Sequence, residues 1–189
     1  LIHTDMTKAF DRVNHELLLV KLSKMGLSES LVHRFSSYLY NRKQLVCING
    51  HISDSYIAVS GVPQGSHLGP LLFNVYVNDI VQVLECDLLV YADDLKIFNV
   101  INSWDDCYML QNSLDNLYQW CVSNDLQLNI AKCNVVTYYR LQNPIIYNYK
   151  VDTEAITMKT CVDDLGITFD SRLEFNSHSM VTWLLSHPE

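Results

Sequence analysis

The alternation of hydrophobic and polar positions predicts a chain of short strands and amphipathic helices. Residues 1–5, an apolar run that ends in an aspartate, are typical of the end of a strand. Asn14 can cap a helix that Gly26 ends, and Ser28 can cap a second helix. Pro70 suits the first turn of a third helix, which is apolar nearly all round and is therefore expected to be buried.

Two hairpins are predicted from turn residues that lie between apolar runs. In the first, Asn49-Gly50 is the favoured type I′ turn between Gln44–Ile48 and Tyr56–Val59. The second covers about residues 87–99, where apolar runs flank a short acidic centre. Ser103 then begins a fourth helix. Strand-like runs follow at residues 134–139, 145–149 and 166–169.

This order of elements predicts an α+β fold. Strand, helices, hairpin, helix and strand match the split β-α-β-β-α-β (ferredoxin-like) sheet, with helices on one face and an insertion. In such a sheet the first strand can lie beside the central hairpin. Asp5 at the end of that strand is then expected to meet Asp93 at the hairpin tip, although the two are far apart in the sequence.

The adjacent carboxylates of Asp93 and Asp94 are the most informative polar feature. Neighbouring carboxylates repel each other unless a cation neutralises them, and Mg²⁺ prefers hard oxygen ligands. The hairpin tip is therefore either a solvated acidic turn or a Mg²⁺ site. The pair of residues by itself leaves both interpretations open.

Composition narrows the class of protein. With 49% hydrophobic residues the chain can build a core, and its net charge of −8 argues against a stand-alone nucleic-acid binder, though not against an active-site piece with basic partners elsewhere. The six cysteines lack metal-binding spacing and are expected to be buried free thiols in a reducing compartment. No signal peptide is visible, and the longest uncharged stretch, residues 55–78, is too interrupted to span a membrane.

Several segments resemble the motifs of reverse transcriptases from non-LTR retrotransposons, LINE-like elements of the jockey and CR1 type. Residues 5–15 (DMTKAFDRVNH) resemble the first catalytic motif, and residues 60–73 (SGVPQGSHLGPLLF) resemble the second. Residues 91–94 (YADD) are similar to the catalytic box, and residues 126–133 (LQLNIAKC) to the motif after it. The segment from 164 to 178 resembles the approach to the thumb.

The resemblance implies a domain organisation. Residues 1–178 correspond to the palm of a right-hand polymerase with partial fingers, the N-terminal part of the fingers being missing. Residues 179–189 correspond to a divergent or truncated tail towards a missing thumb. The missing fingers, thumb and endonuclease domains of a parent protein are then expected partners of this chain.

The activity that the resemblance implies is RNA-directed DNA polymerisation, in which dNTPs are added to a primer 3′-hydroxyl by two-metal-ion nucleotidyl transfer. Asp5, Asp93 and Asp94 are then the catalytic and metal-binding residues. They would hold two Mg²⁺ ions, for which Mn²⁺ can substitute. The RNA template and the DNA primer are the implied partners, and the nucleus is the implied location, with the cytoplasm as the alternative intracellular compartment.

Further roles follow from the same resemblance. Phe10 is expected under the incoming sugar, where its ring excludes a 2′-hydroxyl, and is otherwise a core aromatic. Gln64 and Gly65 are expected at the nucleotide or the template base. Lys132 is expected either at the triphosphate or in solvent. Three residues are expected to contact nucleic acid: Arg42, Lys43 and Tyr91.

Some alternatives stay open on the sequence alone. Asp11 is a rival carboxylate in the first motif, but its position favours a structural role, as a helix cap or as a partner of Arg12. The chain could also be a decayed, catalytically inactive fragment that acts at most as a binding module, or an acidic interaction module that only mimics the motifs. A viral RNA-copying polymerase is a further alternative, although such enzymes usually carry Gly-Asp-Asp rather than Ala-Asp-Asp.

Overall fold

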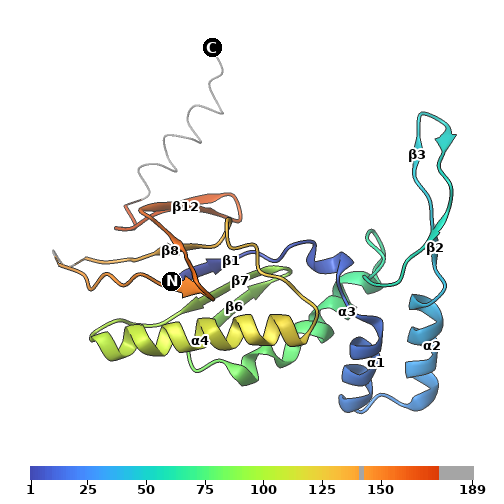
Figure 1. Ribbon diagram of the computed structural model, residues 1–189, viewed down its shortest axis with the longest axis horizontal. Helices are drawn as coiled ribbons and strands as arrows, with labels where there is room; N and C mark the ends of the chain where they lie inside the picture. Colours follow the sequence, from blue (N-terminus) through green and yellow to red (C-terminus); the bar gives the residue numbers. More distant parts are fainter. Residues whose placement is uncertain (141–142, 175–189) are drawn as a thin grey trace. The chain divides into compact units, whose positions relative to one another are not determined.

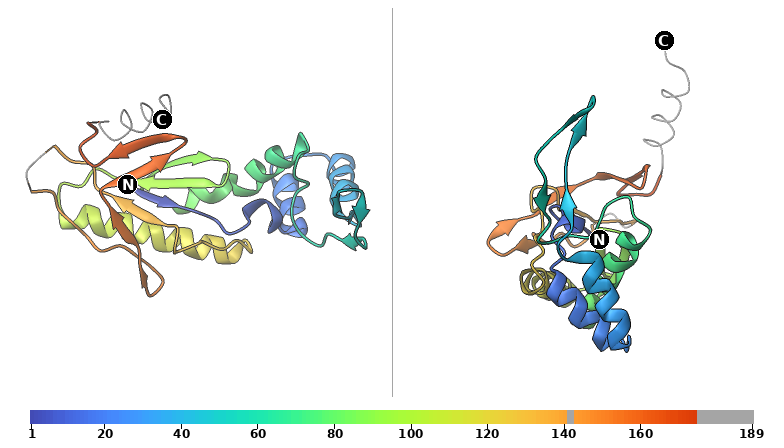
Figure 2. Two further views of the ribbon diagram at one scale, coloured as in Figure 1. Left: turned by 90° about the horizontal axis from the view of Figure 1, so that it is seen from above. Right: turned by 90° about the vertical axis from the view of Figure 1, so that its right-hand side faces the viewer.

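A computed structural model describes residues 1–140 and 143–174, which fall into two compact units (Figures 1 and 2). Unit 1 contains Leu1–Asp5, Leu84–Tyr118 and the described residues from Leu128 onward, and unit 2 contains Met6–Val83 and Gln119–Gln127. The predicted tail over residues 179–189 lies outside the described residues. No helix in the described part of the chain is long and apolar enough to cross a membrane.

Unit 1 is built on a five-stranded sheet in the order β11-β8-β1-β7-β6. Strands β6 (Asp87–Tyr91) and β7 (Asp94–Phe98) form the acidic hairpin, and β1 (Ile2–Thr4) lies antiparallel between β7 and β8 (Asn134–Val136). Strand β11 (Thr157–Lys159) runs parallel to β8 at the edge. The predicted split layout, with the first strand beside the hairpin, is confirmed.

The core of unit 1 lies where helix α4 (Trp104–Ser123) runs along the sheet (Figure 1). The strands contribute the fully buried side chains of Ile2, Leu95 and Ile97, and Ile2 and Ile97 face each other across β1 and β7. The helix contributes buried residues at helical spacing: Cys107, Leu110, Leu114 and Leu117. Since burying one leucine contributes about 1.5–3 kcal/mol, this layer holds α4 on the sheet.

Two smaller hairpins complete unit 1, namely β9 (Lys150–Val151) with β10 (Glu154–Ala155), and β12 (Cys161–Asp164) with β13 (Ile167–Asp170). The strand predicted at residues 145–149 was wrong for the described structure. There the ring of Tyr147 packs against Trp104 and Tyr108 of α4 and against Tyr149, two residues further along the chain. These side-chain contacts, and not a backbone ladder, hold that segment.

Unit 2 contains three helices, α1 (His15–Lys24), α2 (Glu29–Leu39) and α3 (Leu68–Val77). The side chain of Asn14 accepts hydrogen bonds from the N–H groups of Glu16 and Leu17, so the predicted cap of α1 is confirmed. Ser28 lies at the N-cap position of α2, but its hydroxyl bonds the hydroxyl of Ser30 instead of capping the helix.

Two short 3₁₀ segments, η1 (Ala9–Asp11) and η2 (Asn78–Val83), flank the helices of unit 2. Helix α3 is buried on the side of Phe73 and Tyr76, but Leu71 is 54% exposed. The expectation that this helix is buried all round was therefore wrong, because the neighbouring elements of unit 2 cover one side of it. The Tyr76 hydroxyl donates to the carbonyl of Asn124, which ties α3 to the end of α4 within this unit.

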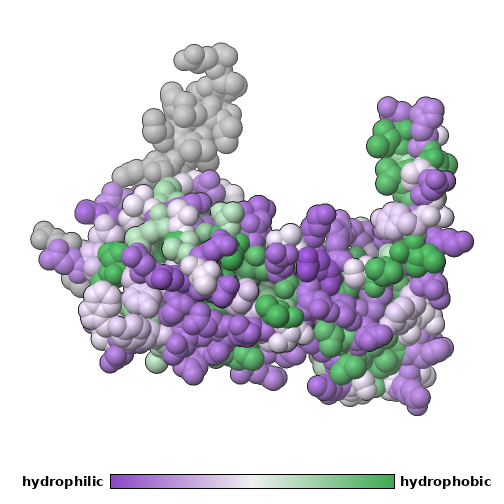
Figure 3. Space-filling view, in the orientation of Figure 1, coloured by the Kyte–Doolittle hydropathy of each residue, from purple (hydrophilic) through white to green (hydrophobic). Residues whose placement is uncertain are grey.

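A long hairpin, here called the arm (residues 43–57), follows α2. Its base pairs β2 (Lys43–Gln44) with β5 (Tyr56–Ile57), and its tip pairs β3 (Cys47–Ile48) with β4 (His51–Ile52). Asn49 and Gly50 both have positive φ, as a type I′ turn requires, although the returning strand starts earlier than expected. Figure 3 shows apolar side chains gathered on the arm, and seven residues on it and just beyond it are exposed: Leu45, Val46, Ile48, Ile52, Tyr56, Ile57 and Val59.

Candidate active site

The carboxylates of Asp5 and Asp94 leave neighbouring strands at the same end of the unit 1 sheet. The register pairs Thr4 with Leu95, so the next residues outward are Asp5 on β1 and Asp94 on β7. The hydroxyl of Thr4 donates to the carbonyl of Leu95 at 3.0 Å, which fixes this register next to the acidic end. The sheet thus brings Asp5 of the first motif beside Asp94 of the catalytic box. The expected meeting of Asp5 with Asp93 stays a prediction.

A tight turn presents Asp93 at the tip of the hairpin. Tyr91 pairs with Asp94, which leaves a loop of Ala92 and Asp93 alone. Ala92 has a φ of 54°, a left-handed conformation that costs a residue with a side chain about 1–2 kcal/mol. Such strain is often found at functional turns, where the surrounding structure holds it in place.

These carboxylates influence one another electrostatically. Burial raises the pKa of Asp94, and the negative charge of Asp93 raises it further. Lys96 lowers this pKa, while Asp164 and Asp5 add to the upward shift. Like charges gathered in this way favour the binding of a cation, which would relieve their repulsion.

Lys132 lies beside Asp5, with its ammonium nitrogen 3.4 Å from Asp5 Oδ2. The backbone explains this position, because the N–H of Asn129 donates to the carbonyl of Asp5 and so ties the motif of residues 126–133 to the end of β1. The lysine side chain is 67% exposed and is therefore free to turn towards a ligand.

A pocket of about 380 Å³ opens on this face of the sheet. Charged side chains from four segments line it: Asp5, Asp94, Lys96, Lys132, Lys159, Asp163 and Asp164. Sequence reasoning missed Lys96 and Asp164, because their proximity follows from the way the β12–β13 hairpin meets the sheet. A lysine two residues after a catalytic box is a weak signal without that pairing.

The donor set fits Mg²⁺. Among the residues that the structure describes, no three His, Cys, Asp or Glu side chains gather closely enough to enclose a metal ion by themselves. Mg²⁺ in polymerase-type sites is held by one or two carboxylates, with substrate phosphates and water as the other ligands. The carboxylate oxygens of Asp5, just after β1, and of Asp93 and Asp94 in the β6–β7 hairpin lie at one end of the sheet and meet that requirement.

In unit 2, the first and second motifs are bonded to each other. The N–H of Gly61 donates to the carbonyl of Val13, and the N–H of Val62 donates to that of Phe10. A side chain at Gly61 would come within 2.8 Å of the Asp11 carbonyl oxygen, so this close approach requires glycine. His15 strengthens the junction, because its Nε2 lies 2.8 Å from the carbonyl oxygen of Gly61.

Asp11 has a structural role, but its partner is not the one expected. Gln64 Nε2 donates to Asp11 Oδ1 at 2.8 Å. Arg12 instead donates to the carbonyl of Asp125 and to the side chain of Gln127. The expected pairing of Asp11 with Arg12 was therefore wrong, because the second motif supplies an amide that reaches Asp11.

Phe10 stacks on Phe73 of α3, with ring centroids 4.3 Å apart and ring planes inclined by 21°. The ring thus packs against the core of unit 2 while remaining partly exposed. Gly65 lies in the turn before α3 with a φ of +75°, so the backbone conformation itself favours glycine there. The two residues belong to the same unit as Gln64 and Asp11.

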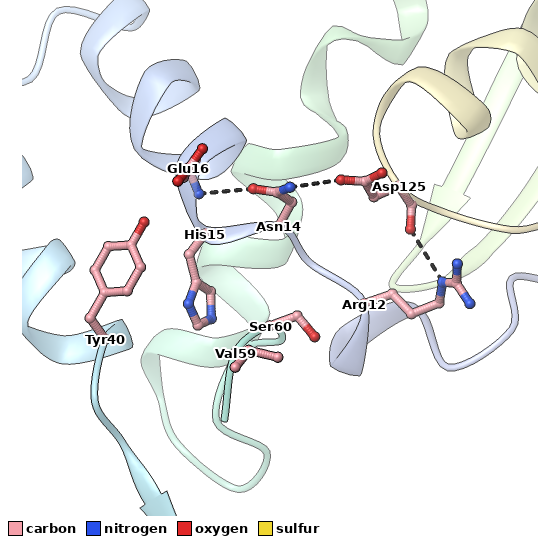
Figure 4. A pocket seen from close by; sticks show the side chains of 8 residues that line it. All are labelled: Arg12, Asn14, His15, Glu16, Tyr40, Val59, Ser60 and Asp125. Carbon is pink, nitrogen blue, oxygen red and sulfur yellow. Dashed lines mark hydrogen bonds between the residues drawn. The ribbon is translucent and has the colours of Figure 1, made fainter. Parts of the chain in front are cut away.

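Figure 4 shows a second pocket, of about 620 Å³, beside the junction of the two motifs in unit 2. Eight residues line it: Arg12, Asn14, His15, Glu16, Tyr40, Val59, Ser60 and Asp125. Asn14 uses its amide nitrogen to donate to Asp125 Oδ2 while its oxygen caps α1. Asp125 was missed in the sequence because its partners come from the first motif, far away in the chain.

The three residues expected to contact nucleic acid lie at different places. Arg42 holds its guanidinium over the ring of Tyr38, 5.5 Å from the centroid, and Lys43 begins the arm. Both belong to unit 2. Tyr91 ends β6 in unit 1 and is 64% exposed. All three side chains, or the larger part of them, are open to a ligand.

Comparisons with known proteins identify the family. Residues 1–175 match the family model described as reverse transcriptase (RNA-dependent DNA polymerase). The chain is 30% identical over 191 residues to a probable RNA-directed DNA polymerase from transposon BS of Drosophila melanogaster, covering 96% of this chain and 21% of that protein. It is 32% identical over 183 residues to the RNA-directed DNA polymerase from mobile element jockey of the same species, covering 92% and 20%. The chain thus spans about a fifth of the length of these relatives.

Solved structures agree on the fold. Telomerase from Candida albicans, in complex with a fragment of telomeric RNA, matches with a TM-score of 0.59 at 17% identity, over 89% of this chain and 30% of that one. Apo telomerase from Candida tropicalis matches with the same TM-score at 15% identity, over 93% and 34%. Given the family match over nearly all the described residues, and the identity with polymerases of fly mobile elements, the chain belongs to the reverse transcriptases, as the reverse transcriptase domain of a non-LTR retrotransposon.

Proposed function

We propose that this chain carries the catalytic centre of an RNA-directed DNA polymerase, which extends a DNA primer on an RNA template with dNTPs. The observation that carries the proposal is the meeting of Asp5 and the Asp93-Asp94 turn at one end of a single sheet. Membership of the reverse transcriptase family supports the reaction class. Unit 1 is then the palm, and unit 2 supplies part of the fingers.

The three carboxylates would hold two Mg²⁺ ions, which would activate the primer 3′-hydroxyl and stabilise the departing pyrophosphate. Asp5, Asp93 and Asp94 are the residues proposed to hold these ions. In this reaction the 3′-oxygen forms a bond to the α-phosphorus of the dNTP as the bond to pyrophosphate breaks, and the hydroxyl proton is released. The role of the protein is to position these groups in line and to balance their charge.

Other residues would orient the substrates. Lys132, which is exposed and lies beside Asp5, is proposed to turn its ammonium towards the triphosphate. Phe10 is proposed to exclude the ribose 2′-hydroxyl, and Gln64 with Gly65 to contact the nucleotide or the template base. The backbone of the nucleic acid is proposed to contact three residues: Arg42, Lys43 and Tyr91. The nuclear location that the resemblance implies stays a prediction.

Primer extension tests the proposal directly. The full chain is mixed with an RNA template annealed to a DNA primer, dNTPs and Mg²⁺, and the extended products are counted. Asp93→Asn keeps the size of the side chain but removes its charge, so extension is expected to fall at least about 100-fold, as when a preorganised electrostatic contact is lost. A variant that extends primers normally contradicts the assignment. A folded wild-type chain that binds the primer–template without extending it points instead to the inactive binding module.

A further inference from the structure

A partly buried ion pair lies next to the acidic turn. The ammonium of Lys96, on β7, is 2.5 and 2.6 Å from the two carboxylate oxygens of Asp164, on β12. Only 11% and 20% of the two side chains are exposed. A lysine in such surroundings depends on its partner, since an unpaired charge away from water is strongly unfavourable.

This pair shares a face of the sheet with the proposed metal ligands. Side chains two residues apart on a strand point to the same face, so Lys96 and Asp94 lie on one side of β7. Asp5, Asp94, Lys96 and Asp164 line the same pocket.

The pairing decides where the positive charge of Lys96 is directed. With Asp164 present, both carboxylate oxygens of that residue face the ammonium. Without that charge, three carboxylates are left in the same pocket to neutralise Lys96, namely those of Asp5, Asp94 and Asp163. The carboxylate of Asp163 already accepts a hydrogen bond from the hydroxyl of Thr168, so those of Asp5 and Asp94 are the ones that remain open to the lysine. A lysine bound to Asp94 or Asp5 would compete with a divalent cation for the same oxygens. Lys132 differs, because it is exposed and can move away when a cation arrives.

We propose that Asp164 is a positioning residue for the metal site, which holds the Lys96 ammonium away from Asp5 and Asp94 and so leaves their charge for divalent cations. The inference rests on the proposed function, since it assumes that these carboxylates bind metal. It assigns to the β12–β13 hairpin a role in cation affinity, although its carboxylate is not a metal ligand.

The test measures the binding of Mn²⁺ to the full chain by calorimetry, without nucleotide or nucleic acid, so no catalysis is needed. Asp93→Asn defines the binding that belongs to the acidic turn, as distinct from weak binding elsewhere on an acidic surface. Asp164→Asn is expected to weaken that binding about ten-fold, or about 1.4 kcal/mol. The double variant Asp164→Asn with Lys96→Met is expected to recover affinity to within about three-fold of the wild type, because the competing charge is gone.

A matched control uses Lys159, another lysine of the same pocket. Combining Asp164→Asn with Lys159→Met removes an equal charge from the pocket but leaves Lys96 in place, so affinity is expected to stay low. Equal recovery by both double variants overturns the proposal, since net charge alone would then explain the effect. An Asp164→Asn chain that binds Mn²⁺ as the wild type does also overturns it.

Folding is followed by circular dichroism and thermal unfolding of every variant. If Asp164→Asn alone does not fold, the double variant Asp164→Asn with Lys96→Met still tests the proposal. Mn²⁺ affinity equal to that of the wild type supports the proposal, and a ten-fold loss of Mn²⁺ affinity overturns it. Failure of the proposed function has a separate signature, namely a wild type and an Asp93→Asn chain that bind Mn²⁺ equally. If Asp93→Asn removes the binding while Asp164→Asn does not change it, only the inference about Asp164 fails.

Discussion

At the scale of single residues, the acidic turn is surrounded by positive charges of two kinds. Lys96 is buried and held by Asp164, whereas Lys132 is exposed and lies 3.4 Å from Asp5. A fixed charge shapes the field that a cation meets, and a mobile one can follow a phosphate as it moves. Phe10 is another fixed side chain, because its ring is stacked on the buried ring of Phe73.

Phe10→Ala is expected to have two separable effects. Loss of the stacked contact with Phe73 should lower the free energy of unfolding by about 2–3 kcal/mol, less than the 3–5 typical of a fully buried ring. Loss of the ring should also let the enzyme incorporate ribonucleotides. Phe73→Leu serves as the control, because it weakens the same stack but keeps Phe10. Unchanged sugar selectivity in Phe10→Ala would show that the ring is only part of the core.

Gly61→Ala tests the close junction between the first two motifs. The added carbon would come within 3.0 Å of three Asp11 backbone atoms, and the φ of +87° already disfavours a side chain. Gly26→Ala is the matched control, since its φ is +90° but the added carbon meets open space in the described part of the chain. Urea unfolding should show about 1 kcal/mol of destabilisation at Gly26 and about 1–3 kcal/mol more at Gly61. Equal losses would mean that the junction can yield.

At the scale of elements, helix α4 begins with a network around one carboxylate. Asp106 Oδ2 accepts hydrogen bonds from the N–H groups of Asn102 and Ser103 and from the Ser103 hydroxyl. These bonds satisfy backbone N–H groups at the start of the helix that would otherwise bond to water. The negative charge of Asp106 also interacts favourably with the positive end of the helix dipole. The helix that covers the unit 1 sheet is thus fixed at its first turn.

The pH dependence of stability should reveal this cap. The backbone hydrogen bond from Asn102, then the bonds from Ser103, lower the pKa of Asp106 below its usual 3.8. Because the folded pKa is lower than the unfolded one, the stabilisation is present above pH 3.8 and is lost as the pH falls through the folded value. Asp106→Asn should therefore be less stable than the wild type at pH 7, and the gap should narrow below about pH 4. Asp105→Asn removes the same charge without those three bonds and should show a smaller change.

How far the sequence predicts an element depends on how local its causes are. The cap of α1 at Asn14 and the Asn49-Gly50 turn were predicted correctly, because a few neighbouring residues determine them. The segment 145–149 was not, because Tyr147 packs on residues distant in the chain. The same limit applies to the site. A short motif identifies the acidic turn, but only the tertiary structure reveals the pairing of Lys96 with Asp164 and the hydrogen bond from Gln64 to Asp11.

At the scale of the whole molecule, both units are assembled from separate stretches of the chain. Unit 1 takes its first strand from the start of the chain and the rest from Leu84–Tyr118 and the described residues after Gln127, while unit 2 combines Met6–Val83 with Gln119–Gln127. The place of the first strand beside the hairpin could be predicted because few topologies fit such an order of elements. The edge strand β11 was not predicted. The division into two units could not, because it depends on which contacts cross between stretches.

The central place of β1 has a consequence for how the protein is made. Its partners β7 and β8 begin at Asp94 and Asn134, so on a ribosome that adds about 5–20 residues per second the first strand waits roughly 7–26 s for its second neighbour. Until β8 is made, the sheet that buries the apolar side chain of Ile2 is incomplete. We expect refolding in vitro to be slow as well, in the range of milliseconds to seconds typical of non-local sheets, which stopped-flow fluorescence of the three tryptophans can measure. In a cell, this interval is when a nascent chain with this topology would depend most on chaperones.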